Sequence, residues 1–148
     1  MRILNFFGSS HVSTKHGFAQ TVTRHYSKIE DNFKSKYCVG EILSYPGATF
    51  NSSDKLDTFF TVASDQTKEV GYEGQINIVI LGSNDQREIN ALPEFLVDSA
   101  LEQFSFRLNS FVDKMLKAEM STLILVTSVI PTELSNLFMD SIVRKVIR

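Results

Sequence analysis

Three short apolar runs and one partly alternating segment, Tyr37 to Ser44, predict four β-strands. They lie at Ile3 to Phe7, Tyr37 to Ser44, Gln75 to Leu81 and Thr122 to Ser128. The run that ends at Leu81 is apolar almost throughout, which is typical of a strand buried on both faces. We therefore expect this strand to lie at the centre of a sheet, parallel to the first one.

Apolar residues at helical spacing occupy the segments between and after these runs. Stripes of this kind run from Phe18 to Ile29, Leu56 to Ala63, Leu92 to Met115 and Leu134 to Val146. Asn51, Ser52 or Ser53 can start the second helix. The polar residues 64–74, which include two glycines, are expected to form a loop. The stripe from Leu92 to Met115 is expected to be a long helix that packs on the sheet.

This alternation of strands and helices predicts the α/β class, as a three-layer α/β/α sandwich with a parallel sheet. The length of 148 residues suits a single domain over residues 1–148. Because ligand sites in such sheets lie at the carboxyl ends of the strands, the residues just after each strand are the candidates for chemistry.

Composition and charge narrow the range of partners. The net charge of −2 and the lack of a basic block argue against nucleic acid. No apolar run is long enough to cross a membrane, and the first residues lack the pattern of a signal peptide, so a cytoplasmic location is the default expectation. Cys38 is the single cysteine, which excludes an intramolecular disulfide. No glycine-rich phosphate loop or metal-ligand spacing is found, so no cofactor and no metal are expected.

Three polar clusters follow the first three predicted strands. The first is Gly8-Ser9-Ser10-His11, the second contains Gly47 after a proline, and the third is Gly82-Ser83-Asn84-Asp85. A doubly wound sheet would bring these strand ends together. A serine hydroxyl, a backbone N–H beside a glycine and an amide N–H₂ are the parts of a nucleophile with an oxyanion hole.

Each cluster also has an ordinary structural interpretation. Ser9 or Ser10 can simply cap a helix. Gly47 can satisfy a type II turn. Asp85 can fix its loop or cap the next turn, and clusters of this composition are common in turns.

The order and spacing of these clusters resemble those of the SGNH (GDSL-type) hydrolases. The matching positions are Gly8-Ser9-Ser10, then Gly47, then Gly82-Ser83-Asn84-Asp85. The sequence Ser10-His11-Val12 is similar to SGNH-type esterase domains of some retroelement-derived animal proteins. The resemblance implies a flavodoxin-like SGNH fold. It also implies a hydrolase activity on small carboxylic esters. Ser10 would be the nucleophile, and Ser10 N–H, Gly47 N–H and the Asn84 amide would form the oxyanion hole.

The sequence departs from the family pattern in two places. Ser9 stands where the family has Asp, and the closing Asp-x-x-His block, which supplies the general base, has no counterpart after His25. The resemblance therefore provides no base, and His11 is the nearest candidate substitute. Because an unactivated serine is a poor nucleophile, we expect weak or no ester hydrolysis.

Two other functions remain open at this stage. The first is a non-catalytic interaction or binding module that keeps the SGNH fold. The second is a flavodoxin-like binder of nucleotide or phosphate, which fits the architecture but not the motifs. Fluorophosphonate labelling separates an activated serine from a non-catalytic module.

The resemblance also affects the expected edge of the sheet. In the family a fifth strand follows, so the domain is expected to be C-terminally incomplete and to lack its last strand. The strand from Thr122 to Ser128 would then be an exposed, apolar edge without lysine or proline. Edges of this kind pair readily with other chains, so the chain is expected to self-associate through this strand or to be only marginally stable.

Overall fold

The computed structural model describes residues 2–12, 36–120 and 122–126 of the 148-residue chain, with only the backbone of the last range. The predicted helices at residues 18–29 and 134–146, and residues 127 and 128 of the fourth predicted strand, lie outside the described residues.

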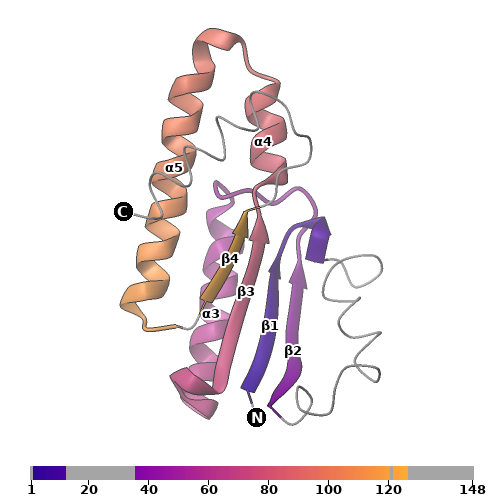
Figure 1. The fold of residues 1–148 in the computed structure, drawn as a ribbon, viewed down its shortest axis with the longest axis vertical. Coiled ribbons are helices and arrows are strands. Elements are labelled where there is room, and N and C mark those ends of the chain that lie inside the picture. Colours follow the sequence, from indigo (N-terminus) through magenta and orange to yellow (C-terminus); the bar gives the residue numbers. More distant parts are fainter. Residues whose placement is uncertain (1, 13–35, 121, 127–148) are drawn as a thin grey trace.

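The described residues form a parallel four-stranded sheet with helices (Figure 1). In space the strand order is β2-β1-β3-β4, and every neighbouring pair is parallel. The elements, in chain order, are β1 (Arg2–Gly8), η1 (Ser10–Val12), β2 (Tyr37–Ser44), α3 (Ser53–Val70), η3 (Tyr72–Gly74), β3 (Gln75–Leu81), α4 (Ser83–Asn90), α5 (Glu94–Lys117) and β4 (Thr122–Val126). The α/β class, the parallel sheet and the internal position of β3 are confirmed.

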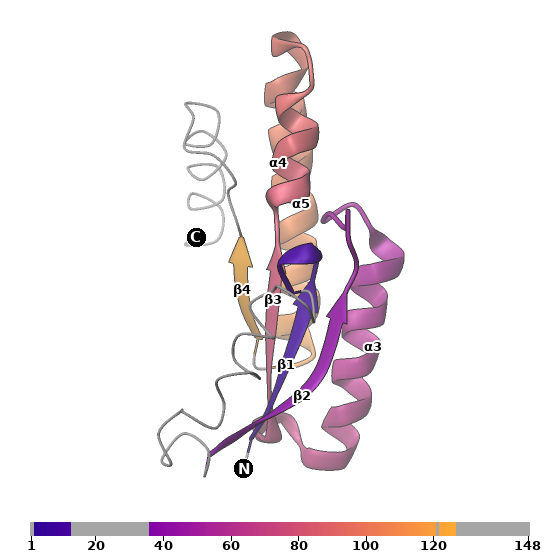
Figure 2. The same ribbon diagram turned by 90° about the vertical axis from the view of Figure 1, so that its right-hand side faces the viewer.

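Helices α3 and α5 cover the same face of the sheet (Figure 2). Phe7 and Val79 point from the sheet into this layer, where Phe7 stacks on Phe59 of α3 with ring centroids 5.2 Å apart. From α5 the buried stripe includes Phe104 and Leu108, as the helical spacing predicts. Burying such large apolar side chains supplies the main driving force for packing both helices on the sheet.

The opposite face of the sheet carries a second apolar cluster. Its buried members are Leu4, Phe6, Val12 and Ile80. Strand residues on both faces of β1 and β3 are therefore apolar, which explains why these two runs lack clear alternation in the sequence. The second helical layer of the expected sandwich would lie on this face, and the segments predicted to form it are outside the described residues.

Strand β2 contains a β-bulge beside Asn5 of β1. Leu4 pairs with Val39 and Phe6 pairs with Ile42, so β2 has one residue more than β1 between these pairs. Gly40 lies at the bulge, where an added Cβ would be 2.7 Å from Asn5 Oδ1. The bulge reverses which residues of β2 face each layer: Val39 and Ile42 contact the second cluster, while Leu43 contacts the helical one.

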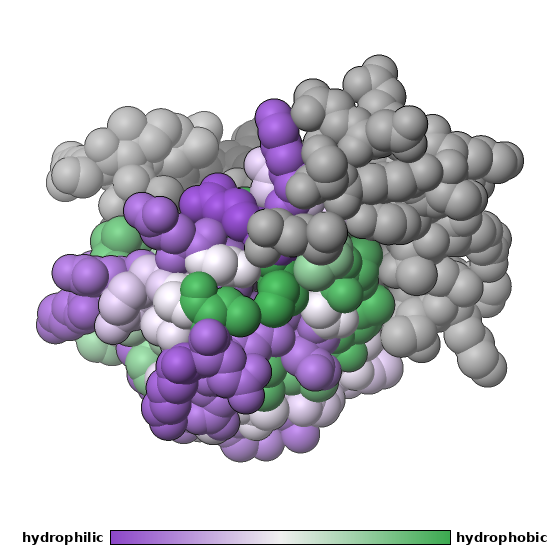
Figure 3. Space-filling view, turned by 90° about the horizontal axis from the view of Figure 1, so that it is seen from below, coloured by the Kyte–Doolittle hydropathy of each residue, from purple (hydrophilic) through white to green (hydrophobic). Residues whose placement is uncertain are grey.

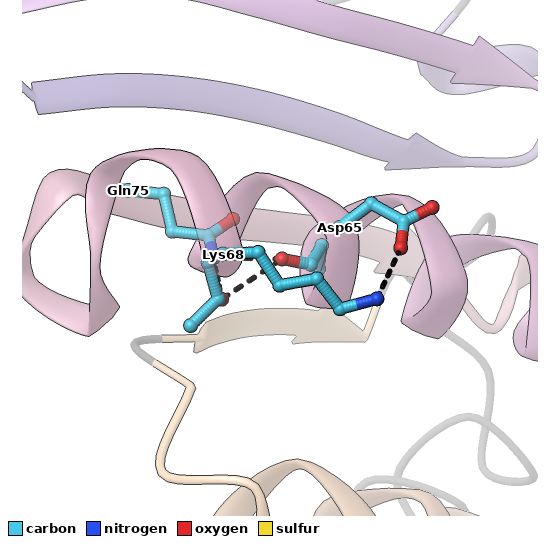
Figure 4. A network of polar contacts seen from close by, with 5 residues as sticks. Asp65, Lys68 and Gln75 are labelled. Carbon is cyan, nitrogen blue, oxygen red and sulfur yellow. Dashed lines mark hydrogen bonds and ion pairs between the residues drawn. The ribbon is translucent and has the colours of Figure 1, made fainter.

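Helix α3 is longer than the sequence predicts, and the expected loop over residues 64–74 is wrong. The helix continues to Val70 and ends before Gly71, which has φ 77°. Its polar last turns pack on polar residues of the sheet, so the apolar stripe does not extend over them. Gln75 Nε2 donates to the Ala63 carbonyl (2.8 Å) and to Thr67 Oγ1, and Figure 4 shows this side chain beside the Lys68–Asp65 ion pair.

Helix α4 has no apolar stripe and was not predicted. The next helix, α5, starts at Glu94, so Leu92 precedes it and is 37% exposed. Leu96, expected in the core, is 41% exposed, because α4 and the start of α5 project beyond the sheet (Figure 1). The helical spacing identified the buried face of α5 but could not show that its first turns extend past the sheet.

At the end of the sheet where the strands begin, the surface carries both hydrophobic and hydrophilic residues. Figure 3 shows that hydrophobic residues there form small groups separated by hydrophilic ones.

The large exposed apolar side chains of the α4–α5 region are Leu92, Phe95, Leu96, Phe106 and Leu116. Among the described helices, none combines the length and hydrophobicity needed to cross a membrane.

Candidate active site

Hydrogen bonds join the carboxyl ends of β1, β2 and β3. The Tyr45 N–H donates to the Gly8 carbonyl (2.8 Å), and the Ser44 hydroxyl donates to the Ser9 carbonyl (3.0 Å). On the other side, the Ser9 N–H donates to the Ile80 carbonyl (3.3 Å). The segments that follow these strands carry the predicted site residues. They therefore begin side by side, at the hydrogen-bonded carboxyl end of the sheet.

Gly8 is required at this edge by the close approach of two strands. A Cβ on Gly8 would lie 2.1 Å from the Ile80 carbonyl oxygen and 2.9 Å from Val12 Cγ2. Such distances exclude any side chain unless the backbone moves. The glycine thus lets the chain turn directly from β1 into η1.

Ser9 and Ser10 occupy different environments. Ser9 is fully buried, and its Oγ has no hydrogen-bond partner among the residues that the structure describes. Ser9 uses its carbonyl, rather than its side chain, to accept the Val12 N–H (3.0 Å). Ser10 and His11 are both exposed on η1. Of the two serines, Ser10 is therefore the one that a substrate can reach.

The residues around Gly47 form a type II turn, as one interpretation of the sequence anticipated. The Ala48 N–H donates to the Tyr45 carbonyl (3.0 Å), Pro46 occupies the second position, and Gly47 has φ 83°. Gly47 is exposed, and no heavy atom lies within 4 Å of the position of an added Cβ. The turn therefore leaves open space beside its backbone.

Two side chains at the start of α4 hold the segment after this turn. Asn84 Nδ2 donates to the Ala48 carbonyl (3.1 Å), and Asp85 Oδ1 accepts the Phe50 N–H (3.0 Å). The sequence singled out Asn84 and suggested that Asp85 fixes a loop. The loop that Asp85 fixes is the one that follows Gly47, and no sequence pattern had indicated Phe50 as its partner.

The Asp85 carboxyl is buried, and within the described part of the chain its Oδ2 has no hydrogen-bond partner. Burial disfavours the charged form and raises the pKa of Asp85 from 3.8 to about 6, although the hydrogen bond from Phe50 opposes this rise. The site therefore contains a carboxyl group that gains and loses its proton in mildly acidic solution.

The structure connects Asn84 to the turn that contains Gly47, and connects the end of β1 to both neighbouring strands. That the Ser10 Oγ, the Gly47 N–H and the Asn84 amide point to one shared acceptor stays a prediction. In the part of the chain that the structure describes, no group of three His, Cys, Asp or Glu side chains could hold a metal ion.

Two solved structures share the fold of this chain. An acetyl xylan esterase, AlAXEase, has a TM-score of 0.63 and 14% sequence identity, covering 98% of this chain and 72% of that chain. TesA has a TM-score of 0.56 and 17% identity, covering 97% of this chain and 69% of that chain. No family model and no curated protein matches the sequence. The chain therefore has the fold of SGNH-type hydrolases, as its sequence motifs predicted.

Proposed function

We propose that the chain is an SGNH-type serine hydrolase domain that acts on small carboxylic esters, with Ser10 as its nucleophile. The observation that carries the proposal is the hydrogen bond from Asn84 to the Ala48 carbonyl. It holds an amide donor beside the Gly47 turn, at the edge of the sheet where the exposed Ser10 follows β1. The shared fold with an acetyl xylan esterase adds support.

In the proposed reaction the Ser10 Oγ attacks the ester carbonyl carbon, and the serine proton passes to a base. The carbonyl oxygen becomes an oxyanion that accepts hydrogen bonds from Ser10 N–H, Gly47 N–H and Asn84 Nδ2. Cleavage of the carbon–oxygen bond releases the alcohol, which takes up a proton. Water then hydrolyses the acyl-Ser10 ester and restores the hydroxyl.

The family motifs matched here do not identify the general base of this mechanism. His11 is exposed and next to Ser10, so it is the nearest candidate, but adjacent residues at a helix start tend to point in different directions. In serine proteases, an oxyanion hole and binding without the triad still give roughly 10³–10⁴-fold acceleration over water. Turnover that depends on Ser10 therefore requires His11 to act as the base, and we expect such turnover to be slow.

Hydrolysis of a short-chain acyl ester and labelling by a fluorophosphonate test the proposal. Ser10→Ala should abolish both signals, and Asn84→Ala should slow hydrolysis by about 10²-fold or more because it removes an oxyanion donor. Asn90→Ala, an exposed position on the same helix, is the matched control and should leave the rate unchanged. Labelling that persists in Ser10→Ala would assign the reactivity to another residue and overturn the proposal.

A non-catalytic module with this fold is the second candidate. It is favoured by Ser9, which stands where the family pattern has Asp and whose buried Oγ lacks a partner in the described ranges. In that case the wild-type chain would show neither labelling nor turnover above the Ser10→Ala background. The closer resemblance to esterase domains of retroelement-derived proteins, which rests on Ser10-His11-Val12, stays a proposal alongside it.

We also propose self-association through β4. Within the described residues β4 pairs only with β3, which leaves its other side free for another strand. Size-exclusion chromatography with light scattering should show a mass that rises with protein concentration. A constant monomeric mass over the whole concentration range would contradict this proposal.

A further inference from the structure

A hollow of about 230 Å³ lies between the first turn of α3 and the second half of α5. Four apolar side chains line it: Phe50, Leu56, Phe106 and Phe111. Phe50 and Phe111 are almost fully buried and form fixed walls, whereas the Phe106 ring is 71% exposed. A large aromatic ring beside an open apolar hollow favours a ligand with an apolar body.

Two cations also line this hollow, and within the described part of the chain only Lys114 forms an ion pair. Lys114 Nζ lies 3.0 Å from Asp57 Oδ1 and 4.4 Å from the centre of the Phe60 ring. Arg107 is half-buried, and within the described part of the chain its guanidinium makes no hydrogen bond or ion pair. A guanidinium has five N–H donors in a plane that matches a carboxylate.

The charged side chains that line the hollow favour an anionic ligand. Among the residues that line the hollow, Asp57 and Lys114 neutralise each other, and the guanidinium of Arg107, which also acts on the Asp85 carboxyl, adds one positive charge beside the apolar walls. Arg107 also borders an adjoining hollow of about 290 Å³ that contains Asp85 and Glu88. The acidic side chains there disfavour an anion, which makes the apolar hollow the better place for one.

We propose that this hollow binds a small monocarboxylate with an apolar chain, separate from the candidate active site. The chain lies against Phe50, Leu56 and Phe111, and the carboxylate accepts hydrogen bonds from Arg107. The proposal goes beyond the proposed esterase function and does not depend on it, because it concerns binding alone. Phe50 is nevertheless held by Asp85, next to Asn84, so a ligand here would contact the segment that supports the active-site turn.

Titration calorimetry of the full chain with hexanoate and with its neutral amide, hexanamide, tests this proposal. Hexanoate should bind more tightly than hexanamide. Arg107→Gln should weaken hexanoate binding by about tenfold or more, the usual effect of losing a charged hydrogen bond, and should leave hexanamide binding unchanged. Arg87→Gln, an exposed arginine on α4 outside the hollow, is the matched control. Equal binding of the two compounds, or an unchanged hexanoate affinity in Arg107→Gln, would overturn the proposal.

A second pair of variants locates the ligand. Ser110→Phe places a ring in the hollow from an exposed position on α5 and should abolish binding of both compounds, with the fold checked by circular dichroism. Asn84→Ala should leave hexanoate affinity unchanged. If Asn84→Ala weakens binding and Ser110→Phe does not, hexanoate occupies the candidate active site and the inference fails. Failure of the esterase proposal is judged separately, from ester turnover.

Discussion

Two polar regions of the sheet, the amide cluster beneath α3 and the candidate active site at the strand ends, are built differently. In the amide cluster Asn5 and Gln66 exchange hydrogen bonds of 2.7 and 3.1 Å, and Asn5 also binds Asn77 and the Glu41 N–H. At the strand ends Ser10 and Gly47 are exposed. Each region also holds a buried polar atom without a partner among the described residues, Ser9 Oγ at the strand ends and Asn77 Nδ2 in the amide cluster.

The difference between the two regions indicates that the amide cluster stabilises the fold, whereas the side chains at the strand ends are available for chemistry. A buried amide that makes many hydrogen bonds stabilises one arrangement, because removing it leaves several buried partners unsatisfied. Donors that are to act on a substrate must be left accessible, so they contribute little to folding. The predictions below test this separation, from the largest expected effect to the smallest.

Gly8→Ala should have the largest effect. The added Cβ would meet the Ile80 carbonyl oxygen at 2.1 Å, which forces β1 away from β3. We expect a loss of more than about 4 kcal/mol in the free energy of unfolding, or no folded protein. Gly47→Ala is the control: its surroundings are open, so only the strain of φ 83° applies, about 1–2 kcal/mol. Soluble yield and chemical denaturation measure both, and a stable Gly8→Ala protein would contradict this account of the edge.

Asn5→Ala should lower the free energy of unfolding by about 3–4 kcal/mol, because it leaves the Glu41 N–H and the Gln66 amide without partners. Asn84→Ala removes one side-chain hydrogen bond and should cost only about 1 kcal/mol. Urea denaturation compares the two. Equal losses would show that the amide cluster has no special structural role.

Asp85→Asn should remove a pH dependence of stability. Since folding raises the pKa of Asp85 from 3.8 to about 6, the folded state binds more protons than the unfolded state between these values. Its contribution to stability is therefore fully present below about pH 4 and is lost as the pH rises through about 6. The total change is at most about 3 kcal/mol at 1.36 kcal/mol per pKa unit.

The Asn side chain can still accept the Phe50 N–H but has no charge to bury. Denaturation curves between pH 4 and 7 should consequently become flatter for Asp85→Asn. Asp98→Asn, at an exposed position on α5, is the matched control and should keep the wild-type slope across this range. An unchanged slope in Asp85→Asn would show that Asp85 is not the group responsible.

Ser10→Ala should have the smallest effect on stability, within about 0.5 kcal/mol, as expected for an exposed surface position. The same substitution should remove ester hydrolysis and fluorophosphonate labelling. Thermal unfolding and the activity assay, measured on one preparation, test both statements. A large loss of stability would assign Ser10 to the framework and weaken its proposed role as nucleophile.

The sequence predicted the strands well because three of them are short apolar runs and the fourth, Tyr37–Ser44, alternates in part, and a polar or glycine residue closes each one. It failed where polar side chains are buried. The last turns of α3 are fixed by Thr67 and Gln66 against polar residues of the sheet, and α4 has no apolar stripe to reveal it. The positions of Ser10, Gly47 and Asn84 after strands could be predicted from order alone. The anchoring of Phe50 by Asp85 could not, because it joins residues 35 positions apart.

The bulge in β2 has a consequence for comparing this chain with its relatives. Val39 and Ile42 face one layer and Leu43 faces the other, so the two halves of the strand are out of phase by one residue. An alignment that treats β2 as a regular strand must place a one-residue gap at Gly40. In a chain without that residue, the side chains of one half of the strand would point to the opposite face of the sheet. Apolar positions that are covered here would then be exposed. Insertions and deletions at this point are therefore expected to be rarer than substitutions.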